Sequence, residues 1–410
     1  MLRRYFTLPL LCLISMSLSA LAYLFLYTNG ITSSKPTICP STRKVLYEED
    51  ASVFKSRLNQ RLIYLGQQFS YINITKLRHI QSTATQNLTY FCSKYCGGWG
   101  DRVRGIVSTY ILAALLERRF TIDMQYPCDL SHFLLPNLID WTRNSHRNPR
   151  KPPLMLDLIH DDYADELYPK LTTIDLRQLW AKHDEIFLTT NDDYITQTLQ
   201  NPFFRRVRSQ INLQSNHSNA HTFFSFIFEL LFKPTSIVIN QIDRLFARAA
   251  QISSQSIICM HVRLGQNPTI PEDEKRPFRQ SLGRDMIEFI DRNLTSRNSS
   301  IFVTSDSLKV INDIYRHYDS KRILSIFGPI IHIDRYDRGK ESDKTLQAGF
   351  LKVIAEFYFL GECDVLVRSP SGFSQWASYR RLNEYSNLYM YCRGVHQVTG
   401  PKWRAPYKIC

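Results

Sequence analysis

The sequence has few charged residues and no internal repeat. Charged residues make up 21% and hydrophobic residues 44% of the 410 positions. Enough apolar side chain is therefore present to build full cores, which excludes an intrinsically disordered chain. The 15 glycines and 18 prolines are ordinary in number, and no self-similarity recurs at a fixed period, so collagen-like, solenoid and propeller architectures are excluded. The length predicts two domains of about 100–200 residues each.

Several ligand motifs are also absent. No lysine follows a G-x-x-x-x-G turn, which disfavours a P-loop kinase. Cys92 and Cys96 have no second pair at zinc-ligand spacing, and no Asp-x-Asp motif lies near the strands expected in the C-terminal half, so we expect no bound metal. The net charge of +14 favours anionic partners, without choosing between nucleic acid, acidic lipid, sulfated sugar and nucleotide phosphate.

One long uncharged run stands near the N-terminus. The 23 residues from Tyr5 to Tyr27 carry no charge, which at about 1.5 Å per helical residue spans a bilayer core of about 30 Å. Arg3 and Arg4 precede it, so the positive-inside tendency predicts a single-pass type II membrane protein with a lumenal remainder. The alternative is a cleaved signal peptide, because Ala20-Leu21-Ala22 has the form of a cleavage site. Either interpretation directs the chain into the secretory pathway, which disfavours nucleic acid as a partner.

Sequons and cysteines agree with a lumenal location. Five Asn-x-Ser/Thr sequons lie beyond the uncharged run, at Asn73, Asn87, Asn216, Asn293 and Asn298. Eight of the nine cysteines also lie beyond it, which suggests disulfides whose pairing the sequence alone does not give. Cys259 stands in the apolar run from Ile257 to Met260, which favours a buried free thiol on a strand.

Pattern and composition divide the chain into five segments. We expect a cytosolic tail at 1–4, a membrane span at 5–27, a stem and leading helix at 28–70, an N-terminal α/β domain at 71–235 and a C-terminal α/β domain at 236–410. In the N-terminal domain, a glycine-rich turn precedes a helix from Arg102 to Arg118 and a strand from Phe120 to Met124. In the C-terminal domain, strands are predicted at 256–263, 301–306, 330–334 and 363–369, with helices between them and after Gly372. This alternation predicts a parallel, doubly wound sheet, whose ligands bind at the carboxyl ends of the strands.

The expected carboxyl ends carry a cation, a carboxylate and a turn of small residues. They are His261-Val262-Arg263-Leu264-Gly265, Thr304-Ser305-Asp306 and Ser369-Pro370-Ser371-Gly372-Phe373-Ser374. Arg263 suits a phosphate because its planar fork gives two charge-assisted hydrogen bonds. A helix that begins after Ser371 adds unpaired N–H donors. Asp306 could accept from a ribose or a base N–H, or Asp306-Ser307 could cap the next helix. The pattern predicts a nucleotide phosphate site.

Four segments resemble the inverting fucosyltransferase superfamily, the group of α-1,2-, α-1,6- and protein O-fucosyltransferases. The run GGWGDRVRGIVSTYILAALLERRFTI resembles its glycine-rich N-terminal signature, HVRLG its H-x-R-x-G donor motif, VTSD its T-S-D strand end, and CDVLVRSPSGFSQWA its C-D-x-x-x-x-S-x-S-x-F-S-x-x-A segment. The resemblance implies a GT-B fold, in which two α/β domains face each other across a cleft. GDP-fucose would be held by the C-terminal domain, and the acceptor mostly by the N-terminal one.

The resemblance also implies a role for each matching residue. Arg263 would contact the β-phosphate and stabilise the charge on departing GDP. His261 and Gly265 would shape the loop that carries Arg263, and Thr304 and Asp306 would lie beside the nucleotide. The residues that would contact the phosphate or ribose are Ser369, Ser371, Gly372, Phe373 and Ser374. Gly98, Gly100 and Arg102 would face the sugar. Asp101 is the candidate general base for the acceptor hydroxyl, with helix capping as its alternative role.

The sequence therefore predicts a lumenal transferase that moves fucose from GDP-fucose to a glycan or glycoprotein acceptor with inversion and without a metal or other cofactor. We expect it in the Golgi membrane, with the ER membrane or secretion as alternatives. Gln266 and Asp101 stand where many superfamily members have Asp and Asn, which leaves the linkage open. A non-catalytic glycan-binding protein with the same fold, and a transferase for another nucleotide sugar, are the alternative functions.

Overall fold

A computed structural model describes residues 52–143, 152–160, 163–214, 221–270, 279–294, 299–335, 342–382 and 385–400. The predicted span at 5–27, most of the stem and the sequons Asn216 and Asn298 lie outside these residues. Within them, no helix combines the length and the apolar character that crossing a bilayer requires.

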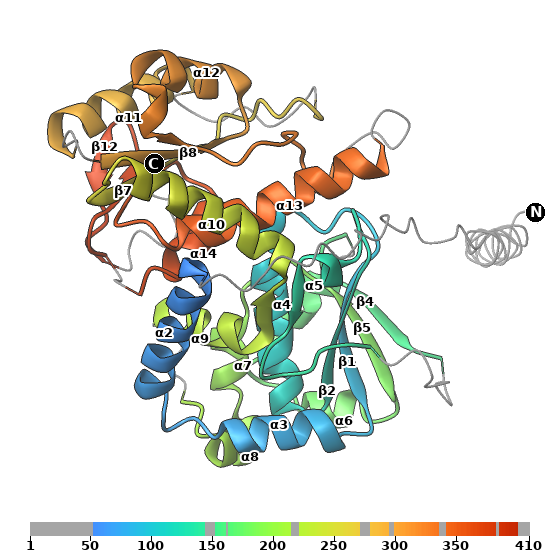
Figure 1. The fold of residues 1–410 in the computed structure, drawn as a ribbon. Helices are drawn as coiled ribbons and strands as arrows, with labels where there is room; N and C mark the ends of the chain where they lie inside the picture. The colour runs from blue at the N-terminus through green and yellow to red at the C-terminus, as the bar shows by residue number, and fades with distance from the viewer. Residues whose placement is uncertain are drawn as a thin grey trace, which may run out of the picture.

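The N-terminal half is built on a four-stranded parallel sheet (Figure 1). Its strands are β1 (Asn87–Cys92), β2 (Arg119–Met124), β4 (Leu154–Asp157) and β5 (Glu185–Thr189), in the order β2-β1-β5-β4. The buried helix α4 (Trp99–Leu115) connects β1 to β2, because parallel neighbours need a crossover. The other helices are α3 (Ile74–Thr83), α5 (Tyr163–Lys170), α6 (Leu176–Leu179), α7 (Ile195–Gln200), α8 (Arg205–Ile211) and α9 (His221–Leu231).

The C-terminal half is built on a six-stranded sheet in the order β12-β11-β10-β7-β8-β9. Its strands are β7 (Ser256–Val262), β8 (Ser299–Ser305), β9 (Ile323–Leu324), β10 (Val365–Arg368), β11 (Leu388–Tyr391) and β12 (Val395–Gln397), and its helices are α10 (Ser236–Gln251), α11 (Arg279–Asn293), α12 (Leu308–His317), α13 (Asp343–Leu360) and α14 (Gly372–Tyr379). All pairings are parallel except β11 with β12. Ile258 and Met260 of β7 face one hydrophobic core and Cys259 faces another, so both faces are covered, as the predicted doubly wound sheet requires.

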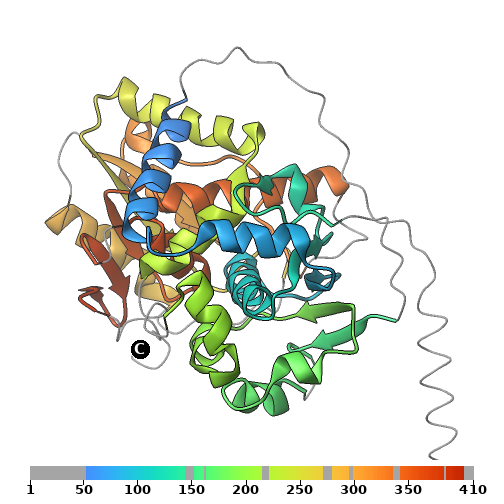
Figure 2. The ribbon, with the colours of Figure 1, turned by 90° about the horizontal axis from the view of Figure 1, so that it is seen from below.

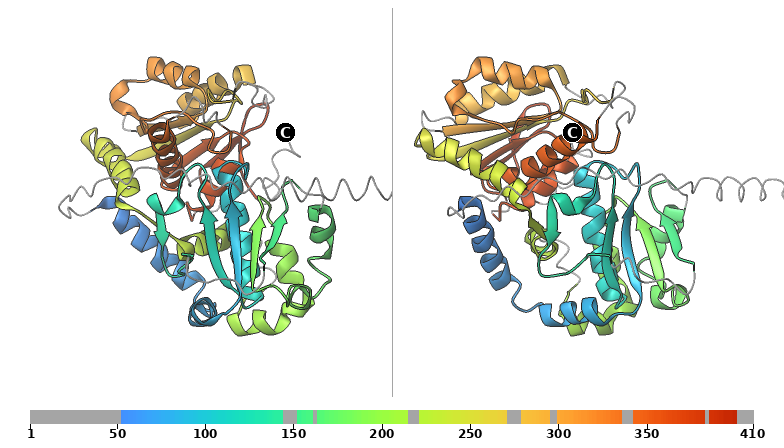
Figure 3. Two further views of the ribbon diagram at one scale, coloured as in Figure 1. Left: turned by 90° about the vertical axis from the view of Figure 1, so that its right-hand side faces the viewer. Right: turned by 45° about the vertical axis from the view of Figure 1, so that its right-hand side comes forward.

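The two halves share a hydrophobic core. The larger cluster of buried residues includes side chains of α4 and β1 as well as of α13 and α14. Figure 3 shows the orange and red C-terminal half above the blue and green N-terminal half. The helix α2 (Val53–Gln68) packs against α9 and α10 (Figure 2), and its Arg61 donates to Glu362 and to the carbonyl of Arg380. The leading helix therefore contacts both halves, through α9 of the N-terminal half and through α10, Glu362 and Arg380 of the C-terminal half. Short elements complete the described chain: β3 (Leu134–Pro136), β6 (Phe232–Pro234) and the 3₁₀ turns Leu130–His132, Pro202–Phe204 and Ser320–Arg322.

Two predictions from the sequence are wrong. The segment 330–334 is not a strand, since the strand beside β8 is the earlier β9. Cys259 is not a free thiol, because it forms a disulfide with Cys363, which lies next to it just before the neighbouring strand β10. Cys92 and Cys96 form a second disulfide, and Cys392 is also disulfide-bonded.

One of the five sequons lies in the interior of a sheet. Asn87 begins β1, which is flanked by β2 and β5. Thr89 of the same sequon is fully buried, and its hydroxyl lies 2.7 Å from that of Thr121 on β2. Asn87 itself is only partly exposed, whereas Asn73 and Asn293 are exposed.

Candidate functional site

A cavity of about 230 Å³ lies between the two halves, at the carboxyl ends of β7 and β8. Its walls include the starts of α4 and α14, the segment 329–333 and one face of α13. Most of the residues predicted from the sequence line it: Gly98, Gly100, Asp101, His261, Arg263, Thr304, Asp306, Ser371, Gly372 and Phe373. Four other predicted residues, Arg102, Gly265, Ser369 and Ser374, are not among the lining residues. The carboxyl ends thus converge as the sequence predicted, but the residues divide into those that face the cavity and those that support it.

Arg263 and Asp306 form an ion pair at the ends of two neighbouring strands. Arg263 Nη1 donates to Asp306 Oδ2 at 2.6 Å, and the Arg263 side chain remains 15% exposed. Asp306 also accepts hydrogen bonds from the backbone N–H groups of residues 264–266, at 2.8 to 3.1 Å. The carboxylate therefore fixes the loop that carries Arg263, a different role from the predicted contact with a ribose or base. The N-cap residue of α12 is Ser307, the second residue of the Asp306-Ser307 pair, and no side chain accepts a capping hydrogen bond there.

Small residues shape the turns around this ion pair. Gly265 has a φ of +70°, which glycine adopts without strain, so three successive N–H groups can converge on Asp306. Ser369 Oγ accepts from the backbone N–H of Arg263 at 2.9 Å. Ser374 Oγ donates to two carbonyls of its own turn, both at 3.4 Å. Ser369 and Ser374, which were predicted to contact the ligand, instead use their hydroxyls within the protein.

His261 lies beside the ion pair as a neutral imidazole. Burial, which is opposed by Asp306 and assisted by the cations Arg368 and Arg263, lowers the pKa of His261 to about 3. The ring lies 5.6 Å from the ring of Phe373, centroid to centroid. A neutral His261 contributes no charge to the cavity. Its ring forms part of the cavity wall and can make a hydrogen bond there.

The starts of α4 and α14 meet at the cavity wall. A Cβ atom on Gly100 would lie 2.5 Å from the backbone nitrogen of Phe373 and 2.6 Å from the carbonyl carbon of Gly372, so only glycine allows this approach. Ser371, Gly372 and Phe373 all line the cavity. The positive end of the α14 dipole is therefore at the wall, where an anion is stabilised.

Asp101 presents a carboxylate from the first turn of α4. Its Oδ2 accepts from the backbone N–H of Gly98 at 3.2 Å, so it closes the helix start as its alternative role predicted. Its Oδ1 lies 3.5 Å from Arg104 Nη2, and 41% of its side chain remains exposed. Although the side chain is partly exposed, the surrounding protein desolvates the carboxylate and raises the pKa of Asp101 above the ordinary value, against the lowering effects of Arg104 and the Gly98 N–H. A carboxylate with a raised pKa at a cavity is suited to accept a proton.

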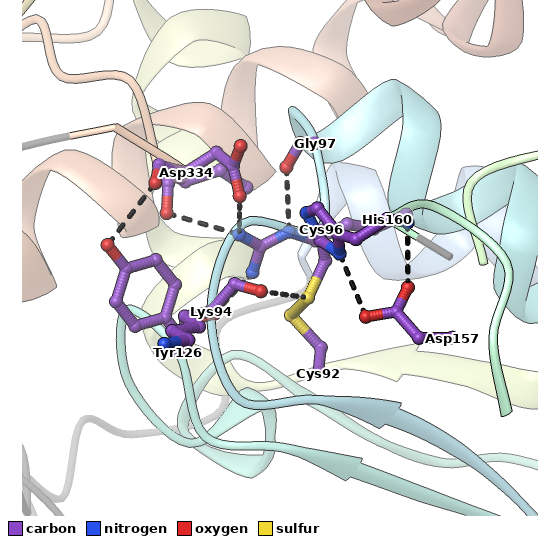
Figure 4. The surroundings of a disulfide bond; sticks show 10 residues. Cys92, Lys94, Cys96, Gly97, Tyr126, Asp157, His160 and Asp334 are labelled. Atoms are coloured by element: carbon purple, nitrogen blue, oxygen red, sulfur yellow. Dashed lines mark hydrogen bonds and ion pairs between the residues drawn. A yellow bond between two sulfur atoms is a disulfide. The ribbon is translucent and has the colours of Figure 1, made fainter. Parts of the chain in front are cut away.

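Arg102 is fully buried and does not face the cavity, which contradicts its predicted contact with the sugar. Its Nε donates to the carbonyl of Gly97 at 2.9 Å, and its Nη1 donates to the carbonyl of Tyr126. Its Nη2 donates to the carbonyl of Ile333 at 3.2 Å and lies 3.4 Å from Asp334. Figure 4 shows Gly97, Tyr126 and Asp334 beside the Cys92–Cys96 disulfide. Arg102 therefore joins the glycine turn of one half to the segment 333–334 of the other.

The cavity also contains polar residues that sequence reasoning missed. They are Asn267, His332, Lys352 and Glu356. Lys352 and Glu356 are one helical turn apart on α13, which is the spacing of an ordinary surface pair, so their spacing did not indicate that they face the cavity. Asn267 and His332 lie in irregular segments, where the pattern of hydrophobic residues gives no indication of which side chains are inward.

No metal ligand set is visible in the described part of the chain, where no three His, Cys, Asp or Glu side chains come together in a way that could hold an ion. The expectation that the reaction needs no metal stays a prediction.

Comparison with known proteins identifies related folds. No family model and no curated protein matches the sequence. The fucosyltransferase NodZ from Bradyrhizobium is similar in structure, with a TM-score of 0.50, 14% identity, and coverage of 78% of this chain and 100% of that one. A mutant of FUT1 from Arabidopsis thaliana, solved in complex with GDP, is also similar, with a TM-score of 0.49 and 15% identity. The match covers 84% of this chain and 79% of the FUT1 chain. At this identity the likeness shows the fold alone: the chain has a GT-B-like α/β fold similar to that of NodZ.

Proposed function

We propose that the protein transfers fucose from GDP-fucose to a hydroxyl of a glycan or glycoprotein, with inversion at the anomeric carbon. The observation that carries this proposal is the convergence of Arg263, the start of α14 and Asp101 on one cavity. A guanidinium and a helix N-terminus suit a diphosphate, and a carboxylate in the same cavity suits an acceptor hydroxyl. The NodZ-like fold and the sequence motifs support the choice of donor.

In this proposal the departing diphosphate is stabilised by groups that are fixed before the reaction. The bond between the anomeric carbon and the phosphate oxygen breaks, and its electron pair passes to the β-phosphate of GDP. Arg263 and the backbone N–H groups at the start of α14 face that charge. Asp306 holds the Arg263 loop through three N–H groups, so little reorganisation is needed.

Asp101 would act on the acceptor. Its carboxylate takes the proton of the acceptor hydroxyl while that oxygen bonds to the anomeric carbon, on the face opposite GDP. Because burial raises the pKa of Asp101, the ionised form is a stronger base than an ordinary aspartate. We further propose that the reaction takes place in the lumen of the Golgi, with the chain anchored through residues 5–27, in line with the uncharged run and the exposed sequons Asn73 and Asn293.

The test is transfer of fucose by the full chain in detergent, measured as GDP release in the presence of a glycan array. Arg263→Ala should lower kcat by about 100- to 1000-fold, which is the loss typical of removing one preorganised donor to a developing anion. Arg284→Ala is the matched control, because Arg284 lies on α11 with 72% of its side chain exposed. Unchanged turnover in the Arg263 variant would remove this mechanism.

Two alternatives remain distinguishable in the same experiment. A transferase for another nucleotide sugar would release a different nucleoside diphosphate when a panel of donors is offered. A non-catalytic glycan-binding protein would be stabilised against heat by a glycan but not by any nucleotide sugar.

A further inference from the structure

One arginine of α4 lies between two partly exposed carboxylates at the edge of the cavity. Arg104 Nη2 lies 3.5 Å from Asp101 Oδ1 and 3.7 Å from Asp192 Oδ1. Asp101 lines the cavity, and Asp192 follows β5 at the carboxyl edge of the N-terminal sheet. The same guanidinium group therefore balances two negative charges, one of which belongs to the proposed general base.

The guanidinium and the second carboxylate are fixed to one short segment. Arg104 Nε donates to the backbone carbonyl of Asn191. A Cβ atom on Gly105 would overlap the carbonyl oxygen of Thr190, so the glycine lets α4 lie directly on the chain after β5. Thr190 Oγ1 in turn accepts from the backbone N–H of Asp192 at 3.3 Å. Arg104 and Asp192 are therefore held beside each other by the backbone of residues 190–192.

Helical spacing brings Arg104 to the proposed base. Asp101 and Arg104 are three residues apart on α4, so their side chains lie on the same side of the helix. An ion pair with this spacing on an open helix surface contributes little. Asp101 lies at a cavity instead, where bound substrates exclude water and strengthen the interaction between the two charges.

Other ionisable groups face Asp101 from the elements around it. They are Tyr90 on β1, Arg102 on α4, His332 and Asp334 of the segment beside the cavity, and the cavity residues His261, Arg263, Asp306, Lys352 and Glu356. Arg102 donates to backbone carbonyls and pairs with Asp334, and Arg263 pairs with Asp306. Arg104 is the cation that most strongly opposes the effect of desolvation on the pKa of Asp101.

We propose that Arg104 is a positioning residue that keeps the Asp101 carboxylate ionised and oriented toward the acceptor hydroxyl, and that Asp192 limits this effect by sharing the guanidinium. The proposal rests on the function proposed above. When Asp101 takes the acceptor proton it becomes neutral, and Asp192 then remains as the counterion of Arg104. The transfer of the proton therefore leaves no cation without a partner at the cavity edge.

The test follows the ionisation of Asp101 in two ways, both on the full chain in detergent. Release of GDP from GDP-fucose, with the glycans of the array as acceptors, gives kcat and kcat/KM as functions of pH. Carbon-13 NMR of labelled aspartate carboxyl groups gives the titration of Asp101 without any need for activity. The Asp101 signal is assigned by its loss in Asp101→Asn.

The two partners of the guanidinium should have opposite effects. Arg104→Gln should move the Asp101 titration and the acid limb of the rate profile to higher pH by about one unit, because a nearby cation is lost. Above this limb, kcat should return close to the wild-type value, because the carboxylate is ionised there. Asp192→Asn should move both curves to lower pH, because it removes a negative charge and leaves the guanidinium to Asp101 alone.

Controls separate this effect from loss of structure. Arg104→Lys keeps the charge, so it should keep the acid limb near the wild-type position. Arg316 pairs with Asp313 in the same order and spacing on the exposed surface of α12, so Arg316→Gln should change neither curve. A purely structural defect in Arg104→Gln would lower kcat at every pH and leave the limb in place, which contradicts the proposal. If Arg104→Gln does not fold, Asp192→Asn and Arg104→Lys carry the test.

The outcomes distinguish the two proposals. An Asp101 titration that is the same in the wild-type protein, Arg104→Gln and Asp192→Asn overturns the role of Arg104, while the transferase proposal stands on the Arg263 variant. Absence of GDP release by the wild-type protein at every pH overturns the transferase proposal. The NMR titration then still decides whether Arg104 and Asp192 control the ionisation of Asp101.

Discussion

Replacing Asp306 by asparagine tests whether this carboxylate organises the site. The substitution keeps the side-chain shape but removes the charge and turns one oxygen into a donor. Oδ1 accepts one hydrogen bond, from Leu264 N, whereas Oδ2 accepts from Gly265 N, Gln266 N and Arg263 Nη1. The amide nitrogen is therefore accommodated best at the Oδ1 position, where it faces a single N–H.

The expected cost follows from these contacts. One buried N–H loses its acceptor, and the three remaining bonds lose the assistance of a negative charge, so we expect Asp306→Asn to lower the free energy of unfolding by about 2–3 kcal/mol. Because the loop carries Arg263, nucleotide affinity should fall as well. Urea denaturation measures the first effect and calorimetric titration with GDP the second.

Asp313→Asn is the control for this measurement. Asp313 pairs with Lys309 and Arg316 on the surface of α12, with 38% of its side chain exposed. A change within about 0.5 kcal/mol is expected there. If Asp306→Asn is as stable as the wild-type protein and binds GDP equally well, Asp306 does not hold the loop in the way described.

Three other substitutions test the surrounding structure. Gly100→Ala should lower the free energy of unfolding by about 1–3 kcal/mol in urea denaturation, because the added Cβ would lie 2.5 Å from a backbone atom. Gly98→Ala is the control and should not lower it, because its Cβ would have no neighbour nearer than 3.7 Å. Equal effects of the two substitutions would contradict this packing. Burial lowers the pKa of His261 to about 3, so between about pH 6.5 and pH 3 the unfolded chain binds a proton at His261 that the folded chain does not bind, and the free energy of unfolding should fall as the pH drops through this range. The substitution His261→Asn should make this fall less steep. An unchanged pH profile in the variant would refute the assignment. The Cys259–Cys363 disulfide joins residues 104 positions apart, so replacing both cysteines by alanine should lower the free energy of unfolding by about 3–5 kcal/mol, and a fully stable double variant would contradict this.

The fold could be predicted from the sequence where apolar runs and helical patterns are long. The strand expected at 256–263 is β7 at Ser256–Val262, and the helix expected from Arg102 to Arg118 is α4 at Trp99–Leu115. The error at 330–334 has a physical cause. Isoleucine-rich segments favour strands, but strand formation depends on a partner, and the place beside β8 is taken by β9. Ile331 instead buries its side chain against Gly349 of α13, and Ile330 lines the cavity.

The candidate site could be predicted only in part from the sequence. Motif spacing indicates which backbone positions reach the ends of the strands, but not which way each side chain points. Arg102 follows Asp101 directly, yet a step of about 100° around the helix turns it into the core. The hydroxyl of Ser369 and the carboxylate of Asp306 bond to N–H groups that only the folded loop presents. Lys352 and Glu356 have the spacing of an ordinary surface pair, so only their burial reveals them.

The contacts between the halves determine how the proposed chemistry could work. Asp101 belongs to α4 and Arg263 to the C-terminal sheet, so a displacement at one carbon atom needs the two halves in fixed register. The close approach at Gly100 and the bonds from Arg102 to Ile333 and Asp334 provide that register. Holding the base and the leaving-group stabiliser in place before the reaction lowers the entropic part of its barrier. A substitution at this junction should therefore slow transfer even though every group that touches the substrates is intact.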